Sequence, residues 1–240
     1  MATATAPRVT VVVPVYNESK ILPSASAELV GQLDGSGWDY EVIFAENGST
    51  DDTREILADL ANTFPRVRVL SETEPNYGRA LRHGILEATG EFVICEEIDL
   101  LNADFHRQAI RILVDRNADM VVGSKAAEGA LDERPLVRRA ATLVLNGMLR
   151  VALGYRGTDT HGLKAFRRKT LLPVAQACKV EKDLFASEFV VRAYRMGVRV
   201  VEIPITIREK RRPSVHLFKR VPKVLKDLSR LVYAIRVKGD

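Results

Sequence analysis

The sequence is poor in the features that mark secreted, membrane-spanning and zinc-binding proteins. Only 2 cysteines occur among 240 residues, Cys95 and Cys178, and neither belongs to a Cys-x-x-Cys or Cys/His pattern, so we expect two buried thiols and no zinc site. Unpaired thiols favour a reducing compartment. The first residues, MATATAPR, contain no apolar core of a signal peptide. No run reaches the roughly 18 apolar residues of a membrane span.

An excess of positive charge is absent from most of the chain and is confined to its end. The net charge is +5, yet residues 208–240 contain eleven Lys or Arg and three acidic residues, so the remainder is slightly acidic. A basic segment on a near-neutral body indicates a polyanionic partner: a membrane surface, a phosphate group or a nucleic acid. Nucleic acid is the least favoured, because the segment lacks interleaved aromatic residues that stack on bases.

Apolar strands alternate with helical patterns along the chain. The predicted strands are 9–15, 40–46, 67–72, 91–97, 119–124, 162–166 and 198–207, and the predicted helices are 19–33, 52–62, 79–88, 104–116, 135–153 and 184–196. Strands that are apolar throughout are buried on both faces, so this alternation predicts an α/β fold with a mostly parallel central sheet and helices on both faces. No repeat, low-complexity segment or linker interrupts the pattern. We therefore expect one domain, 1–212, followed by a basic amphipathic tail, 213–240.

Polar residues directly follow several predicted strands. The sequences PVYNE, ENGSTDD, EEIDLLNAD and GSK stand at four strand ends. The carboxyl ends of parallel strands share one edge of the sheet, where ligands bind. Several carboxylates at one edge repel one another unless a cation or a cationic ligand lies between them. Each motif alone is explained by an ordinary cap or turn, but the four together indicate a ligand site.

These motifs, in this order and spacing, resemble family 2 glycosyltransferases of the GT-A fold, which has a Rossmann-like sheet. Further along, GSK, RPLVRRAATLVLNGMLRVALG, DTHGLKAFRR and REKRRPS resemble segments of dolichol-phosphate mannose synthases and related polyprenyl-phosphate glycosyltransferases. The resemblance covers about residues 8–220. It implies an enzyme that transfers a hexose from a nucleoside diphosphate to polyprenyl or dolichyl phosphate, with mannose as the first choice and glucose as the second.

The resemblance assigns the acidic strand end to a metal ion. Glu97, Ile98 and Asp99 stand where the family has Asp-x-Asp, which implies Mg²⁺ or Mn²⁺ held by Glu97 and Asp99 against the donor diphosphate. The chain departs from the family here, because the first Asp is a Glu and a Gln of the relatives is Leu101, which cannot ligate.

Two alternatives follow from that departure. Asn102 or Asp104 is the substitute ligand that the sequence offers. The other alternative is a degenerate site that uses basic groups in place of metal.

The resemblance also implies a donor pocket. Its residues are Pro14, Tyr16, Glu18, Ala45, Asn47, Arg79, Glu97, Ile98 and Asp99, with Lys210 and Arg211 in a basic loop over the diphosphate. Asn47 replaces an Asp that meets the base, and an amide offers both a donor and an acceptor, so GDP is the first choice and UDP the second. Gly48 is expected to serve a turn with positive φ. For Arg79, a solvated place at a helix start is the alternative.

The resemblance places the acceptor phosphate at Lys125, Arg138 and Thr142. Arg138 and Thr142 are one helical turn apart and therefore share a face. A phosphate oxygen is already anionic and needs no general base, but it needs cations to overcome repulsion by the donor diphosphate. The predicted catalytic residues are therefore Asp99, Glu97, Lys125 and Arg138.

Asp159 and His161 match a family stretch on the sugar side, and an ordinary loop role is the alternative for His161. We expect inversion at the sugar carbon, because the resembling branch inverts.

The tail carries apolar residues at helical spacing and basic residues between them. This pattern predicts a helix on an anionic membrane surface at the cytoplasmic face, and a helix packed on the domain fits equally well. Some relatives carry transmembrane helices after this point, so attachment through the tail or through a separate membrane-anchoring protein is expected.

Two other functions remain open. One is a family 2 glycosyltransferase with a soluble sugar or glycan acceptor. The other is a non-catalytic sugar-nucleotide-binding protein, which Glu97 and Leu101 suggest.

Overall fold

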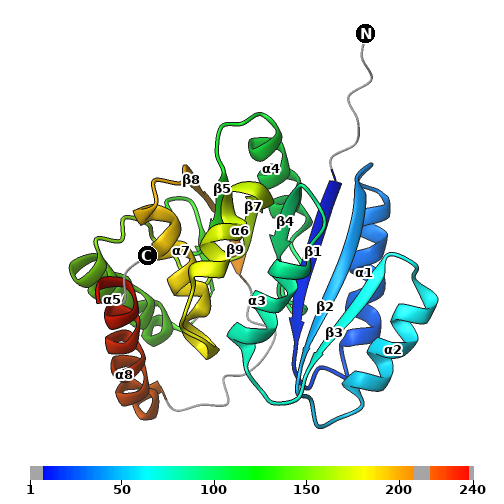
Figure 1. The fold of residues 1–240 in the computed structure, drawn as a ribbon, viewed down its shortest axis with the longest axis horizontal. Helices are drawn as coiled ribbons and strands as arrows, with labels where there is room; N and C mark the ends of the chain where they lie inside the picture. The colour runs from blue at the N-terminus through cyan, green and yellow to red at the C-terminus, as the bar shows by residue number, and fades with distance from the viewer. Residues whose placement is uncertain (1–7, 134, 208–216, 238–240) are drawn as a thin grey trace.

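The structure, a computed structural model, describes residues 8–133, 135–207 and 217–237 (Figure 1). A seven-stranded sheet with the order β3-β2-β1-β4-β7-β5-β8 forms its centre. The strands are β1 (Arg8–Val15), β2 (Asp39–Asn47), β3 (Val67–Glu72), β4 (Phe92–Cys95), β5 (Met120–Ser124), β7 (Lys164–Arg167) and β8 (Val200–Pro204). The helices are α1 (Leu22–Asp34), α2 (Thr53–Thr63), α3 (Tyr77–Glu87), α4 (Ala103–Val114), α5 (Leu136–Leu153), α6 (Arg168–Ala177), α7 (Phe185–Arg195) and α8 (Leu217–Arg236), with a 3₁₀ turn, η1 (Lys182–Leu184).

The sheet is parallel except at one strand. β7 runs antiparallel between β4 and β5, while the other pairs of this sheet are parallel. The predicted α/β fold with a mostly parallel sheet is therefore confirmed. From β1 the chain builds outward through β2 and β3, then returns to β4 on the other side of β1. Ligands in such sheets bind where the order reverses, at the carboxyl ends of β1 and β4.

Two hydrophobic cores sandwich the sheet. In β1, Val9, Val11 and Val13 face a first core that α1, α2 and α4 cover, while Val12 faces a second core under α3, α6 and α7 (Figure 1). Alternating side chains of a strand point to opposite faces, so a run of valines supplies both cores at once. This packing fixes the strand ends, and with them the loops that carry the candidate site.

Two parts of the observed structure differ from the prediction. Helix α6 follows β7 directly and was not predicted, because it contains Pro173 and proline breaks most helices. Its side chains Leu171 and Val174 are nevertheless buried. The predicted strand 198–207 divides at Ile205 into β8 and the short β9 (Thr206–Ile207), which pairs with β6 (Leu131–Asp132).

The described side chains of α8 pack on the body of the protein. Leu228, Leu231 and Ile235 belong to the second core. Arg192 of α7 is fully buried, and it donates from Nε to Glu188 at 2.8 Å and from an Nη to the carbonyl of Ala234 in α8 at 3.3 Å. The part of the tail that can be described thus follows the packed alternative.

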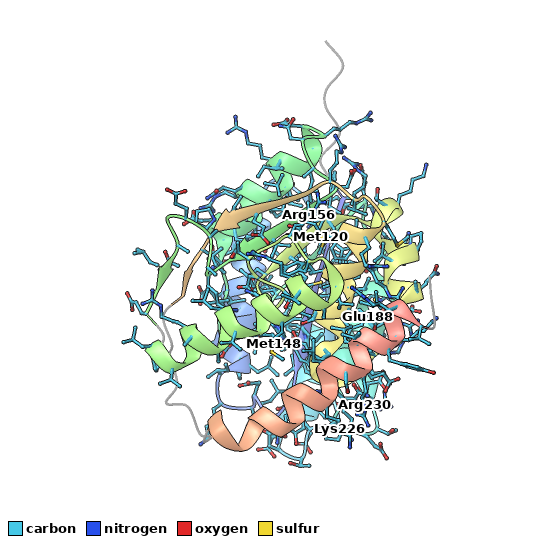
Figure 2. All side chains as sticks on the ribbon, turned by 90° about the vertical axis from the view of Figure 1, so that its left-hand side faces the viewer. Met120, Met148, Arg156, Glu188, Lys226 and Arg230 are labelled. Carbon is cyan, nitrogen blue, oxygen red and sulfur yellow. The ribbon has the colours of Figure 1, made fainter. Side chains whose placement is uncertain are left out.

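Within the described ranges, no helix is both long enough and apolar enough to cross a membrane. Figure 2 shows α5 and α8 beside each other on one face of the molecule, and the two helices are in contact.

We expect Leu231→Ala to lower the free energy of unfolding by about 2–5 kcal/mol, because it leaves a cavity in the second core. Urea denaturation without lipid measures this change. The matched control is Val237→Ala, at a side chain that is 65% exposed beside the end of α8. Equal, small losses from both substitutions would mean that α8 does not belong to the folded body.

Candidate active site

Hydrogen bonds fasten the loops after β1 and β2 to each other. Asn17 donates from its backbone to the Ser49 hydroxyl at 3.0 Å and accepts from the backbone of Thr50 at 2.8 Å. Asn17 has a φ of 53°, in the left-handed region that asparagine tolerates. These bonds place Tyr16 and Glu18, two predicted donor residues, on the rim of the sheet edge, with Tyr16 exposed.

The strands before these loops are neighbours in the sheet. Pro14 of β1 pairs with Ala45 of β2. Gly48 has a φ of 72°, and a Cβ on it would lie 2.7 Å from the carbonyl carbon of Glu74. The predicted positive-φ turn at Gly48 is therefore confirmed.

Asn47 and Asn76 form one side of the expected base site. The buried Asn47 Oδ1 accepts a hydrogen bond from the backbone of Asn76 at 2.5 Å, and no described residue accepts from the side-chain N–H donors of Asn47. Asn76 caps α3 by accepting from the backbone of Arg79 at 3.1 Å. It also accepts from the backbone of Lys182 and donates to Glu181 at 2.7 Å, so the segment before η1 is tied to this wall.

The Arg79 side chain, a predicted donor contact, forms an ion pair within the protein. Its Nε donates to Glu72 at 2.8 Å, and Glu72 also contacts His83. The guanidinium is thus engaged in an ion pair beside α3, which favours the alternative of an ordinary residue at a helix start.

The acids after β4 divide into two environments. Glu96 is buried, contacts His106 Nε2 at 2.5 Å, and accepts from the backbones of Glu97 and Asn102 at 3.0 and 3.2 Å. Glu96 therefore fixes the loop between β4 and α4 and does not face a ligand.

The side chains of Glu97 and Asp99 lie outside this network. Ile98 between them packs into the first core, so the chain turns both acids away from that core. Crowding by protein atoms, and then the negative charge of Asp99, raise the pKa of Glu97, although its side chain still touches solvent. The Glu97 side chain is exposed to water, and the neighbouring charge of Asp99 disfavours its ionised form. Asp99 also lines a cavity of about 280 Å³ beside α1.

This pair fits a single divalent metal ion. Mg²⁺ is usually held by one or two carboxylates together with substrate phosphates and water. No group of three His, Cys, Asp or Glu that could hold a metal occurs among the described residues, so a nucleoside diphosphate and water would supply the other ligands.

The substitute ligands named from the sequence are engaged elsewhere. Asn102 caps α4 through the backbone of Phe105 at 2.8 Å, and Asp104 pairs with Arg107 at 2.5 Å. Leu101 packs against the first core.

A buried lysine that the sequence prediction missed lies beside the acids. Lys164 begins β7, pairs with Cys95 at the end of β4, and is 3% exposed. Its Nζ donates to the Gly162 carbonyl at 2.6 Å. Burial lowers the pKa of Lys164, and Cys95, Asp159 and Glu97 oppose this shift.

The signal for Lys164 was present in the sequence. A lysine between Leu163 and Ala165, in a short apolar strand, is costly to bury unless an anion meets it. Such a residue in a predicted strand is a candidate anion-binding group.

Lys125 and Asp159 form a second charged pair. Lys125 Nζ lies 3.1 Å from Asp159 Oδ2, and Asp159 also accepts from the backbone of His161 at 2.9 Å. Burial disfavours the ionised Asp159, but Lys125 and the His161 N–H outweigh it and hold the Asp159 pKa below its usual range. The side chain of His161 itself is exposed.

Two of the three expected acceptor residues line one cavity of about 180 Å³. Lys125 and Thr142 both line it, together with Arg139 and Leu143, which the sequence prediction did not assign. Arg138 lies in α5, but its side chain is outside the part of the structure that is described, and so are Lys210 and Arg211.

Residues 10–172 match the sequence model of Glycosyl transferase family 2. The chain belongs to this family. It is a glycosyltransferase, and the predicted enzyme class and family are confirmed.

Two curated relatives of this glycosyltransferase extend well beyond it. Glycosyltransferase AglD of Haloferax volcanii is 29% identical over 92% of the chain and 36% of its own length. Dolichyl-phosphate beta-glucosyltransferase ALG5A of Trichomonas vaginalis is 26% identical over 82% of the chain and 65% of its own length. The chain therefore spans about a third and just under two thirds of these two proteins.

Solved structures share the fold. Glucosyl-3-phosphoglycerate synthase from Mycobacterium tuberculosis, in complex with Mn²⁺, UDP-glucose and phosphoglyceric acid, has a TM-score of 0.69 at 20% identity, covering 94% of this chain and 80% of that one. The mannosyltransferase PcManGT from Pyrobaculum calidifontis, in complex with GDP-Man and Mn²⁺, has a TM-score of 0.62 at 22% identity, covering 96% and 69%. These likenesses confirm the GT-A fold.

We expect Lys164→Met to lower sugar turnover by roughly a hundredfold while leaving the melting temperature unchanged or higher. Removing a buried charge relieves its desolvation cost, whereas a transition state that gathers negative charge loses a fixed cation. Turnover assays and thermal denaturation measure the two effects.

The control is Lys169→Met, at an exposed lysine of α6. If Lys164→Met lowers the melting temperature, and activity falls only as far as the folded fraction falls, Lys164 has a structural role alone.

Proposed function

We propose that this glycosyltransferase moves a hexose from a nucleoside diphosphate to the phosphate of a polyprenyl or dolichyl phosphate. One observation carries the proposal: acids and cations divide the carboxyl edge of the sheet between them. Glu97 and Asp99 follow β4, Lys125 follows β5, and Lys164 begins the strand between β4 and β5. Such an edge suits two anionic substrates that must be brought together.

The acidic side would receive the donor. Glu97 and Asp99 would hold Mg²⁺ or Mn²⁺, which neutralises charge on the departing diphosphate when bound. Tyr16, Glu18 and Asn47 would position the nucleoside from the loops after β1 and β2. Because the Asn47 oxygen is already engaged, its N–H donors would meet a carbonyl of the base.

The basic side would receive the acceptor. Lys125 and Thr142 line one cavity, and Arg138, one turn before Thr142 in α5, is proposed to join them. An acceptor phosphate oxygen forms a bond to the anomeric carbon as the bond from that carbon to the donor phosphate breaks. The electron pair leaves with the nucleoside diphosphate, no proton has to be removed, and the configuration inverts. Cations supply what this reaction needs, since they offset the repulsion between the two anions.

The donor is proposed as GDP-mannose first and UDP-glucose second. Support for the lipid acceptor comes from the relative that is named a dolichyl-phosphate beta-glucosyltransferase. A soluble acid is the second candidate acceptor, because a neighbour of the same fold is in complex with phosphoglyceric acid.

A donor and acceptor panel tests the proposal. Purified protein with Mn²⁺ should transfer hexose from GDP-mannose or UDP-glucose to a short polyprenyl phosphate. Asp99→Asn should lower this turnover at least about a hundredfold, because it removes a charge from the metal and diphosphate site. Asp104→Asn, at an exposed acid paired with Arg107, is the matched control and should keep full activity.

The panel includes phosphoglyceric acid as the soluble arm. Transfer to that acid but not to the lipid phosphate would replace the proposed acceptor. If Asp99→Asn keeps its activity in excess chelator, the metal assignment is wrong.

We expect Arg138→Ala to weaken use of the lipid phosphate by about tenfold or more while leaving donor affinity nearly unchanged, because a charge-assisted contact to one substrate is removed. Calorimetry with donor alone, and kinetics at varied concentrations of a water-soluble lipid phosphate, separate the two effects. Arg150→Ala, three turns further along α5, is the control. Loss of donor affinity with an unchanged acceptor constant would assign Arg138 to the donor.

A further inference from the structure

The outer face of α5 is apolar and open to solvent. The exposed fractions are 75% for Leu136, 64% for Leu143, 62% for Val144 and 86% for Val151. Val137, Ala140, Ala141 and Gly147 extend the same exposed surface. Exposed apolar residues elsewhere, such as Val114 and Met196, are scattered and need no explanation, but a contiguous stripe marks an interaction surface.

Helical geometry separates this stripe from the inner face of α5. Residues 136, 140, 143, 144, 147 and 151 recur at helical spacing, whereas Asn146, Leu149 and Leu153 point inward and are buried. Arg139 and Arg150, about three turns apart, run along one edge of the stripe. The helix therefore carries two apolar faces, of which the fold uses one.

The tail helix does not offer a comparable face in its described part. Most of the apolar side chains of α8 that can be described pack into the second core. Met148 of α5 also packs against this core, on the side of α5 that faces α8 (Figure 2). The basic side chains at the stripe are those of α5 itself, Arg139 and Arg150, and both are exposed. An apolar stripe edged by arginines is the pattern of a helix at an anionic bilayer surface.

The stripe is continuous with the cavity proposed for the acceptor phosphate. Leu143 belongs to the stripe and also lines that cavity, beside Lys125 and Thr142. A lipid whose phosphate lay between those two residues would thus leave along the apolar face of α5.

We propose that the α5 stripe, Leu136 to Val151, inserts shallowly into an anionic lipid bilayer and delivers the lipid acceptor to the cavity at Lys125. The inference rests on the proposed lipid acceptor, but it locates the membrane contact on α5 and not on the tail. Arg139 and Arg150 stay at the level of the headgroups while the stripe lies among the upper acyl carbons. A second copy of the chain is a poorer occupant, because pairing would bring arginine-edged, basic surfaces together.

Vesicle binding tests the inference without any substrate. The protein should sediment with vesicles of phosphatidylcholine and phosphatidylglycerol, and Val144→Asn with Val151→Asn should weaken this partition about tenfold, because two apolar side chains no longer leave water. Val114→Asn with Met196→Asn is the matched control and should bind as the parent does. The stripe variants leave the net charge of the protein unaltered. If they bind vesicles as the parent protein does, adsorption is purely electrostatic and the proposal is wrong.

Site-specific fluorescence locates the contact. Cys95 and Cys178 are buried, so an introduced thiol can be labelled selectively with an environment-sensitive dye. Dyes on Val144→Cys and Val151→Cys should shift to the blue with vesicles, while a dye on Val114→Cys should not.

Three results would overturn the inference: no binding of the parent protein to vesicles, equal shifts at all three positions, or a dimer in light scattering that the stripe variants dissociate. Sugar transfer to a water-soluble short-chain lipid phosphate is measured in parallel. Transfer without vesicle binding would refute the membrane contact alone, and vesicle binding without transfer would refute the proposed function alone.

Discussion

The buried ammonium group of Lys164 is the constraint around which the rest of the site is arranged. It lies at the carboxyl edge of the sheet, where water is excluded and its pKa falls. A charge in that position is tolerated only among partners of opposite sign, and Asp159 and Glu97 are near enough to influence it. The reversed direction of β7 makes this possible, because the first residue of an antiparallel strand lies where its parallel neighbours end.

The charged groups of the predicted site and of its neighbourhood differ in what each is already bonded to. Glu96 is used by His106, Arg79 by Glu72, and Asp104 by Arg107, so these groups belong to the scaffold. Glu97 and Asp99 remain as neighbouring acids, and the repulsion between them is the kind that a bound cation removes. Among the described residues Glu97 and Asp99 have no ion-pair partner, whereas Lys125 is paired with Asp159.

The fold was readable from sequence because local signals and global packing agree in it. Valine-rich strands and amphipathic helices alternate, and Gly48 marks the turn that only a residue tolerant of positive φ can make. Helix α6 escaped prediction because Pro173 opposes it locally while the second core stabilises it. Lys164 escaped because its importance depends on which strands β7 lies between, and pairing of distant strands leaves no trace in local periodicity. The ion-pair partners of Arg79 and Asp104 likewise could not be predicted, because they depend on where the side chains lie in the folded protein.

The contacts of Asn76 have a consequence for how this protein could diverge. Asn76 connects three segments of the chain. Its backbone N–H donates to the Asn47 side chain at the end of β2, and its side-chain oxygen accepts from the backbones of Arg79 in α3 and of Lys182 in η1, more than a hundred positions further along the chain. If Asn47 reads the nucleobase, as proposed, a change of base preference would therefore not be confined to the loop that carries Asn47. Variation at Asn47 should be accompanied by variation around Glu181 and Lys182, so these distant positions are expected to change together among descendants of one ancestral gene.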